Sequence, residues 1–257
     1  MIPHQRIIGK ILVTDLLDSY RDDSVSVISR SFNQYLPVAS PLSLARILDA
    51  QVIDEIHLSW IGGLSDLSID KFYQLVKSIS SSISVPLAIS CRLASFNQAS
   101  TLFSLGADKV IIGRNLFSSA SLLSQISKVY GRQSIVASLD YSSDGDLLYL
   151  SNKPNSPIKI SALPSLVNNL CIGEVSLNSI DTDGSLSPHP IYSCLNVQEF
   201  NIPVLVSGGY RHHTHISSAF SSSVNGVILS SFLAKSDQSV QQIKARLIND
   251  GFRLRFY

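Results

Sequence analysis

The strongest constraint on the fold of this chain is a regular alternation between short apolar runs and longer amphipathic stretches. Eight runs are rich in β-branched and other apolar residues: RIIGKILV (6–13), DEIHLSWI (54–61), VPLAIS (85–90), DKVIIG (108–113), SIVASLD (134–140), GEVSLNSID (173–181), IPVLVSG (202–208) and GVILSS (226–231). Intervening stretches such as SIDKFYQLVKSIS and SVQQIKARLIND place apolar residues at helical spacing. Strands that alternate with helices predict a parallel α/β fold, and a single (β/α)8 TIM barrel fits the length of 257 residues.

The chain also repeats itself. SVPLAIS (84–90) matches NIPVLVS (201–207), and at the same offset ADKVII (107–112) falls on VNGVIL (224–229). DEIHL likewise falls on GEVSL, which aligns Glu55 with Glu174. An open, doubly wound sheet does not predict such a repeat. We therefore expect one domain made of two half-barrels, roughly residues 1–125 and 126–257.

Composition limits the partners of the chain. The net charge is +1, and no Lys/Arg run provides the basic patch of a protein that binds nucleic acid or an anionic membrane. MIPHQRIIGKILVTD has too short an apolar run for a secretory signal, and no segment approaches the roughly 18 uncharged apolar residues of a membrane span. We expect a cytoplasmic protein that binds a small molecule or another protein.

Aspartates follow two neighbouring predicted strands. Asp140 ends the fifth strand, and LNSIDTDGS (177–185) places Asp181 and Asp183 after the sixth. In TIM barrels the chemistry lies at the carboxyl ends of the strands, where paired carboxylates divide acid and base roles. An isolated DxDG is more often an Asx turn that closes a strand. We expect Asp140 and Asp183 to face one cavity at the carboxyl-terminal mouth of the barrel.

The seventh and eighth predicted strands end in small residues. Glycines let backbone N–H groups approach an anion, and TIM barrels often hold phosphate in the loops after strands 7 and 8. The residues concerned are Ser207, Gly208, Gly209, Ser230 and Ser231. They predict one phosphate-binding site.

Three other groups of residues have simpler interpretations. RHHTH (211–215) spaces His212 and His215 for a metal, but no nearby Cys or Asp completes a site, so we expect no metal and no cofactor. Asp144 and Asp146 flank a DG turn between two short strand-like runs, which predicts a β-hairpin. Trp60, at the end of the second strand, is more often a core residue than a platform for substrate.

Several of these motifs also occur in the order and spacing of a known family. They are RII (6–8), DE (54–55), GADKV (106–110), SIVASLD, GEVSLNSIDTDGS and IPVLVSGG, and the match continues to the final GFRLRF. The chain resembles the cyclase subunit of imidazole glycerol phosphate synthase. That family is a barrel of two half-barrels that takes ammonia from a glutaminase, a class I glutamine amidotransferase. It closes an imidazole ring on a small molecule with a phosphate at each end. The resemblance implies a catalytic role for Asp140 and a supporting one for Asp183.

The resemblance fails at four places around the expected site, one of which is Trp60, at the end of the second strand, where the family has an acidic residue. The family's strand-1 aspartate is replaced by Leu12, and leucine cannot transfer a proton. Its glycine run after strand 3 reads SCR (90–92) here, which leaves Arg92 as a charged fork for an anion. The segment after strand 1 is unrecognisable, and Asp15 and Asp18 would supply the missing acid only if that loop folded inward.

At the opposite end of the barrel the resemblance is complete. Arg6, Glu55, Lys109 and Glu174 begin strands 1, 2, 4 and 6, and they match the charged ring that gates the family's ammonia passage. Asp108 matches a residue of the family's glutaminase-docking face. The alternative for the ring is a set of salt bridges that only closes the barrel.

Three hypotheses for the function remain open from the sequence. The first, which we favour, is the branch of the family in surface-polysaccharide gene sets, which works with two amidotransferase proteins to install an acetamidino group on a sugar. An apolar residue at Leu12 is expected there. The second is a genuine histidine-pathway cyclase. The third is a non-catalytic barrel that docks or regulates a glutaminase.

Overall fold

Eight parallel strands close into a barrel. The computed structural model describes residues 4–14, 25–30, 34–61, 66–144, 146–150, 156–185, 187 and 195–256, so Asp15 and Asp18 lie outside the described residues. The barrel strands are β1 (Arg6–Thr14), β4 (Glu55–Trp60), β5 (Leu87–Ser90), β6 (Lys109–Ile112), β7 (Ile135–Asp144), β10 (Glu174–Ser179), β11 (Val204–Ser207) and β12 (Gly226–Leu229). Each pairs in parallel with its neighbours, and β12 returns to β1. The predicted (β/α)8 fold is confirmed.

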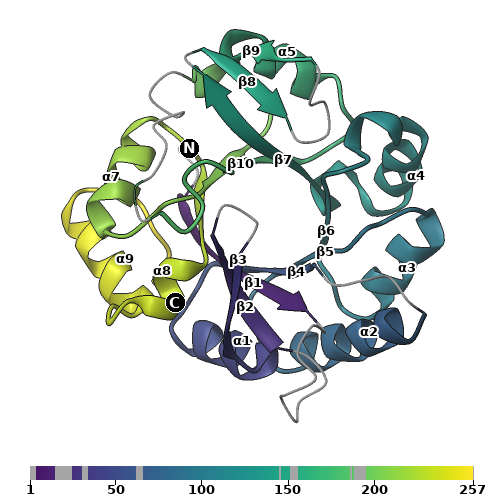
Figure 1. Ribbon diagram of the computed structural model, residues 1–257, viewed down its shortest axis with the longest axis horizontal. Helices are drawn as coiled ribbons and strands as arrows, with labels where there is room; N and C mark the ends of the chain where they lie inside the picture. The colour runs from purple at the N-terminus through teal and green to yellow at the C-terminus, as the bar shows by residue number, and fades with distance from the viewer. Residues whose placement is uncertain are drawn as a thin grey trace.

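Helices form the outer ring of the barrel, as the view along its axis shows (Figure 1). They are α1 (Pro41–Ala50), α2 (Asp66–Ser80), α3 (Phe96–Ser104), α4 (Ala120–Tyr130), α5 (Leu163–Asn168), α7 (His213–Ser221), α8 (Ser231–Lys235) and α9 (Val240–Asn249). Short 3-10 turns lie at Leu116–Ser118, Arg132–Ser134, Ile160–Ala162 and Val197–Glu199. No helix within the described ranges is both long and apolar enough to cross a membrane.

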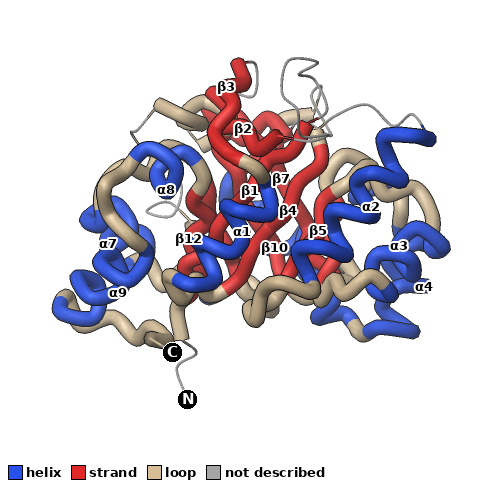
Figure 2. The backbone as a smooth tube through the Cα atoms, turned by 90° about the horizontal axis from the view of Figure 1, so that it is seen from below, coloured by secondary structure: helices blue, strands red, loops and turns tan. Residues whose placement is uncertain are grey.

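Two additions to the barrel stand at its carboxyl-terminal end. A hairpin of β2 (Val25–Arg30) and β3 (Gln34–Ala39) pairs antiparallel with β1, and it rises above the barrel on the side away from the two chain ends (Figure 2). Our sequence reading, with a helix after each strand, missed this hairpin. The polar–apolar alternation of Val25, Ser26 and Val27 was the available signal.

The predicted hairpin around Asp144 and Asp146 is confirmed. β7 continues beyond the barrel wall and pairs antiparallel with β8 (Leu147–Leu150), so that Asp144 lies opposite Leu147. β8 in turn pairs with β9 (Ile158–Lys159).

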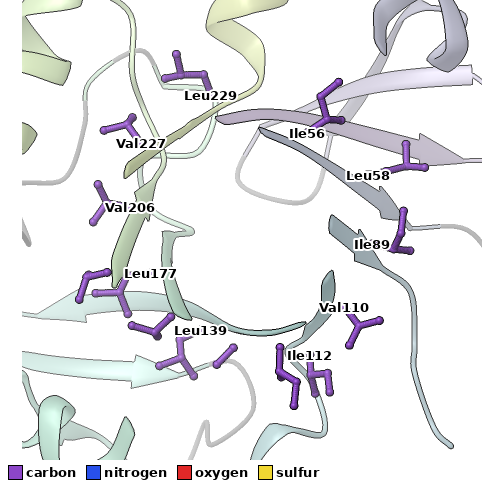
Figure 3. Packing of buried hydrophobic residues seen from close by; sticks show 14 of the residues in the cluster. Ile56, Leu58, Ile89, Val110, Ile112, Leu139, Leu177, Val206, Val227 and Leu229 are labelled. Carbon is purple, nitrogen blue, oxygen red and sulfur yellow. The ribbon is translucent and has the colours of Figure 1, made fainter. Parts of the chain in front are cut away.

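The barrel strands separate two packing layers because successive side chains of a strand point to opposite faces. Residues such as Ile56, Leu58 and Leu139 point outward and pack in the main core between strands and helices (Figure 3). Inside the barrel the apolar clusters are small and comprise Ile8, Leu205 and Ile228, and separately Ala88, Ile111 and Val136. The remaining inward positions of β4 and β10 are polar, and they lead to the candidate site.

The last long helix anchors this architecture through its own sequence. Ser239 and Gln242 form a capping box at the start of α9, which satisfies the backbone N–H groups exposed there. The α9 side chain Lys244 is almost fully buried, and its Nζ lies 2.6 Å from Asp54 Oδ1 and 2.6 Å from the Val52 carbonyl oxygen. Asp54 directly precedes β4, so the ion pair ties the outer helix to the base of the barrel.

Candidate functional site

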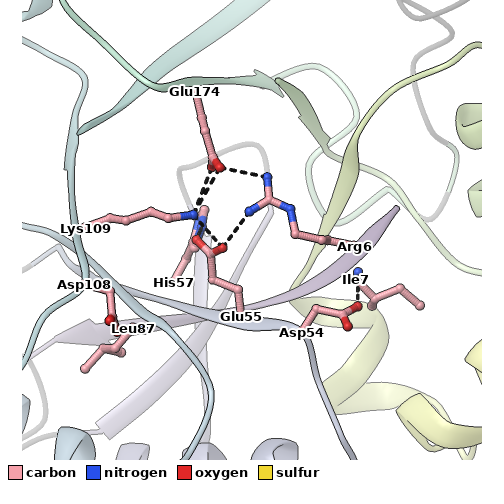
Figure 4. A network of polar contacts seen from close by, with 9 residues as sticks. All are labelled: Arg6, Ile7, Asp54, Glu55, His57, Leu87, Asp108, Lys109 and Glu174. Atoms are coloured by element: carbon pink, nitrogen blue, oxygen red, sulfur yellow. Dashed lines mark hydrogen bonds and ion pairs between the residues drawn. The ribbon is translucent and has the colours of Figure 1, made fainter. Parts of the chain in front are cut away.

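The four charged residues predicted to form a ring do meet at the amino-terminal end of the barrel (Figure 4). Arg6 Nη1 lies 2.8 Å from Glu55 Oε2, and Arg6 Nη2 lies 3.0 Å from Glu174 Oε1. Lys109 Nζ lies 2.8 Å from Glu55 Oε2 and 3.1 Å from Glu174 Oε1. Each cation therefore contacts both carboxylates. The function of this charged ring as a gate stays a prediction.

Glu55 is the most deeply buried member of the ring, with a side chain only 1% exposed. Burial by itself raises its pKa, but the hydrogen bond from His57 and the charges of His57, Lys109 and Arg6 outweigh that effect and lower the pKa to about 2. A buried carboxylate is costly unless it is paired in this way. Glu55 therefore remains ionised at neutral pH.

The sequence reading missed His57, the next inward residue of β4. Its Nε2 lies 2.9 Å from Glu55 Oε1, and its side chain is only 3% exposed. The period-two pattern of a strand was the available signal, since Glu55, His57 and Ser59 share one face. His57 and Ser59 both line the cavity above the ring.

That central cavity has a volume of about 170 Å³ and is lined by both polar and apolar residues. Its lining comes from seven strands and the residue after β4, and comprises Lys10, Leu12, His57, Ser59, Trp60, Ile61, Ser90, Ile111, Ser138, Asp140, Ser176, Asn178 and Ile228. Lys10 was not among the predicted residues, although it stands two positions before Leu12 and therefore faces the same side of β1. The cavity thus combines a cation, an imidazole, a carboxylate and several hydroxyl groups.

Asp140 is held against one wall of the central cavity. Asn178 lies opposite it in the register of β7 and β10, and Asn178 Nδ2 donates to Asp140 Oδ1 at 2.8 Å. The same amide donates to Ser138 Oγ at 2.8 Å, and Ser138 Oγ lies 3.5 Å from Asp140 Oδ1. These contacts orient the Asp140 carboxylate, as a proton-transferring group requires.

Asp183 is not among the residues that line this cavity, and whether Asp140 and Asp183 act in one site stays a prediction. Asp183 lines a smaller neighbouring cavity, although Ile228 borders both. The reason is local: Asn178, not Asp183, is the β10 residue in register with Asp140, and the turn after Ser179 carries the chain toward β11 and β12.

Asp181 is likewise absent from the central cavity. It is exposed, and its Oδ2 accepts a hydrogen bond from the backbone N–H of Ser143 at 2.9 Å. Asp181 therefore ties the turn after β10 to the extension of β7, which agrees with the turn interpretation of DTDG.

The residues of the predicted phosphate site lie together around the smaller cavity. Ser207, Gly208, Gly209, Ser230 and Ser231 all line it, beside Asp183 and Gly184. Whether it binds phosphate stays a prediction.

Gly208 is indispensable for the shape of this loop. Its φ is +116°, and a Cβ atom at this position would lie 2.9 Å from the Ser179 carbonyl oxygen and 3.0 Å from Thr182 Oγ1. Gly209 also has a positive φ, of 75°. Two adjacent positive φ values turn the backbone in a way that side chains with a Cβ rarely allow.

The rebuilt segment after β5 contributes little to the cavity. Ser90 lines it, whereas Arg92 is exposed. Burial raises the pKa of the Cys91 thiol to about 11, so Cys91 is protonated and weakly nucleophilic at neutral pH. Trp60 contacts both the cavity and the outer core. It lines the cavity, and its ring centroid lies 5.1 Å from that of Phe72.

The histidines considered as metal ligands take part in local hydrogen bonds. His212 precedes α7, and its Nδ1 accepts from the backbone N–H of Thr214. His215 Nδ1 accepts from the backbone N–H of Arg211. Within the described residues, no three His, Cys, Asp or Glu side chains gather closely enough to hold a metal ion.

Asp108 lies at the amino-terminal end of the barrel, beside the ring residue Lys109. It is exposed, and its Oδ2 accepts a hydrogen bond from the backbone N–H of Leu87 at 2.8 Å. The carboxylate therefore has a structural contact of its own. Its role in docking stays a prediction.

Comparison with known proteins agrees with this arrangement. Residues 17–238 match the histidine biosynthesis protein family, which covers most of the chain. The chain belongs to this family. A putative imidazole glycerol phosphate synthase subunit hisF2 from Prochlorococcus marinus (strain MIT 9313) is 29% identical over 98% of both chains. The imidazole glycerol phosphate synthase subunits HisF of Myxococcus xanthus (strain DK1622) and Thermotoga sp. (strain RQ2) are 28% and 26% identical, over 85% and 91% of this chain.

Membership in the histidine biosynthesis protein family confirms the resemblance drawn from the motifs. The matches cover 98%, 88% and 93% of these three relatives, so the likeness extends over whole barrels rather than one half.

Proposed function

We propose that this chain is the ammonia-using subunit of a synthase, and that it acts on a phosphorylated small molecule in the central cavity. The observation that carries the proposal is that two sites, the charged ring and the central cavity, follow one another along the axis of one barrel. A fully paired charged ring closes the base, and directly above it the cavity holds Asp140, oriented by Asn178.

The ammonia is proposed to come from a glutaminase that docks on the amino-terminal end. An apolar plug would close the barrel at lower cost than four charges, so the ring is consistent with a passage that must open. Arg6, Glu55, Lys109 and Glu174 would form its gate. The exposed Asp108 lies beside Lys109 on the same end of the barrel and offers a charge for docking.

The pathway is proposed to be the installation of an acetamidino group on a sugar during surface-polysaccharide synthesis. Leu12 lines the cavity in the place where the resemblance puts an acid–base carboxylate, so ring closure of the histidine-pathway type lacks one of its groups. The alternative is the histidine-pathway cyclase itself, which the names of the relatives favour.

Docking is tested by pulling down a purified class I glutamine amidotransferase from the same gene set and by measuring its glutaminase rate. We expect association and a changed rate with the wild-type chain. Asp108→Asn keeps an oxygen for the Leu87 N–H but removes the charge, and it should weaken association about tenfold if the charge contributes roughly 1.4 kcal/mol.

Asp146→Asn is the matched control, because Asp146 is exposed on the hairpin at the other end of the barrel. Absence of both association and rate change with the wild-type chain would refute the glutaminase partnership. A weakening with Asp108→Ala but not with Asp108→Asn would limit Asp108 to its structural contact.

A further inference from the structure

We propose that His57, oriented by Glu55, is a second proton-transfer group of the central cavity and works opposite Asp140. This inference rests on the proposed function in one respect, namely that the central cavity is the reaction site. It goes beyond that function because it assigns a proton-transfer role to His57, a residue outside the motifs that carry the family resemblance.

The first step of the argument is the position of His57. Glu55 and His57 are successive inward residues of β4, so one side chain lies in the ring and the next lines the cavity floor. Lys10 is opposite His57 in the register of β1 and β4, and Leu12 is opposite Ser59 one layer higher. His57 therefore belongs to the strand next to Leu12, one layer below the position of the missing carboxylate.

The second step is the tautomer. Glu55 is ionised and can only accept hydrogen bonds, so the 2.9 Å contact requires a proton on His57 Nε2. In the neutral ring the lone pair is then on Nδ1. A buried carboxylate that fixes the tautomer of a histidine and stabilises its imidazolium form is a recurrent arrangement at proton-transfer sites.

The third step is the partner across the cavity. Hydrogen bonds with Asn178 and Ser138 orient Asp140. A hydrogen bond to Glu55 orients His57, so the cavity contains two oriented groups that can transfer protons. In the proposed step, His57 Nδ1 accepts a proton from an N–H or O–H group of the bound molecule. Glu55 balances the imidazolium charge, and the proton later returns to the product or to solvent.

Glu55 is the charged neighbour of His57 on β4, and the other charged and titratable groups around His57 come from four further strands. They are Arg6 and Lys10 from β1, Lys109 from β6, Asp140 from β7 and Glu174 from β10. Glu55 makes the direct contact with the imidazole of His57. Glu174 is the other carboxylate among the four charged residues at the base of the barrel. Glu174 therefore supplies a matched control.

The test uses the full-length chain labelled with ¹⁵N-histidine, and it needs no substrate. Long-range ¹H–¹⁵N spectra report which ring nitrogen carries the proton, and His57→Gln assigns the signal. We expect a protonated Nε2 and a lone pair on Nδ1 at neutral pH. Glu55→Gln should abolish this preference, whereas Glu174→Gln should retain it.

A second measurement tests whether His57 and Asp140 are electrostatically coupled across the cavity, as the proposal requires. Because Asp140 lines the same cavity, removing its charge in Asp140→Asn should move the pH midpoint of the His57 signal to lower pH. Asp146→Asn should leave it unchanged. This arm decides the question even if Glu55→Gln fails to fold.

The inference would be overturned if neutral His57 carried its proton on Nδ1. It would also be overturned if Asp140→Asn left the pH midpoint of the His57 signal unchanged. Either result would leave the glutaminase partnership standing, because that is judged by association and glutaminase rate. Conversely, loss of the partnership would not alter these spectra.

Discussion

Single residues determine the electrostatics of the barrel interior, and Glu55 is the clearest case. Its carboxylate is buried, contacts Arg6, Lys109 and His57, and has a pKa of about 2 in the folded chain against 4.5 as the ordinary value. A depressed pKa means that the ionised form stabilises the folded state above pH 4.5. That contribution is lost as the pH falls toward 2.

The first prediction concerns this pH window. The ionised Glu55 should contribute about 3 kcal/mol to the free energy of unfolding at pH 7, and part of it should be lost between pH 4.5 and pH 3. Urea unfolding at several pH values measures it. The difference between wild type and Glu55→Gln should narrow over that window, while the difference for the exposed Glu199→Gln should not. A pH-independent difference for Glu55→Gln would contradict the assignment.

The second prediction concerns Gly208, whose loop borders the small cavity. Gly208→Ala adds a positive-φ strain and a Cβ that lies 2.9 Å from the Ser179 carbonyl oxygen. Gly251→Ala adds only the strain, because nothing lies within 4 Å of its Cβ. We expect Gly251→Ala to cost about 1 kcal/mol in unfolding free energy and Gly208→Ala about 1–3 kcal/mol more.

Titration with inorganic phosphate completes this test. Only Gly208→Ala should weaken phosphate binding, since Gly251 is remote from the small cavity. Equal losses of stability in the two variants would show that the approach to Ser179 imposes no steric constraint.

At the scale of elements, strands carry the site and helices hold the strands in place. β4 and β10 each present a polar inward face that begins with a ring carboxylate, in Glu55-x-His57 and in Glu174-x-Ser176. α9 in turn is joined to the start of β4 by Lys244 and Asp54, and Asp54 Oδ2 accepts from the Ile7 N–H at 2.7 Å. One buried ion pair therefore links a helix and two barrel strands.

The third prediction tests that link. Burial raises the pKa of Asp54 despite the opposing effects of Lys244, so the carboxylate depends on its partner. Lys244→Met should destabilise the chain by about 3–5 kcal/mol, because it leaves a buried carboxylate without its cation. Lys235→Met on α8 removes an exposed lysine and should cost less than about 1 kcal/mol. Thermal unfolding of the two variants measures this difference. Equal losses of stability would refute a stabilising role for the ion pair between Lys244 and Asp54.

At the scale of the whole molecule, the barrel places the ring and the cavity on one axis. The strands begin at the ring and end at the two cavities, so any molecule entering at the base must pass the inward faces of β4 and β10. The two half-barrels proposed from the repeat would each contribute one such face. This arrangement is what turns two separate polar clusters into one candidate reaction path.

The fourth prediction distinguishes the two proposed pathways. The wild-type chain should fail to rescue a histidine auxotroph that lacks its own cyclase, because Leu12 cannot transfer a proton. Leu12→Asp places a carboxylate in the cavity opposite Ser59 and should improve rescue if Leu12 is the limiting residue. Leu12→Asn is the control of similar size without a charge. Growth with the wild-type chain would favour the histidine-pathway cyclase.

Local pattern alone determined the parts of this protein that depend on periodicity and on short motifs. The eight barrel strands, the amphipathic helices and the Asp144 hairpin follow from apolar spacing and turn chemistry, which act over a few residues. The grouping of Arg6, Glu55, Lys109 and Glu174 was inferred from the resemblance, which matches them to the charged ring of the family, and the structure shows that they meet. The β2–β3 hairpin was missed although its alternation was visible.

Only the tertiary structure decided which inward residues share a cavity. His57 and Lys10 share the strand faces of Glu55 and Leu12, but the sequence does not show that these faces meet around one cavity. Asp140 and Asp183 looked like a pair, but strand register places Asn178 beside Asp140 and sends Asp183 to another cavity. Register and barrel closure bring together residues far apart in the chain, and they depend on packing of the whole sheet rather than on local sequence.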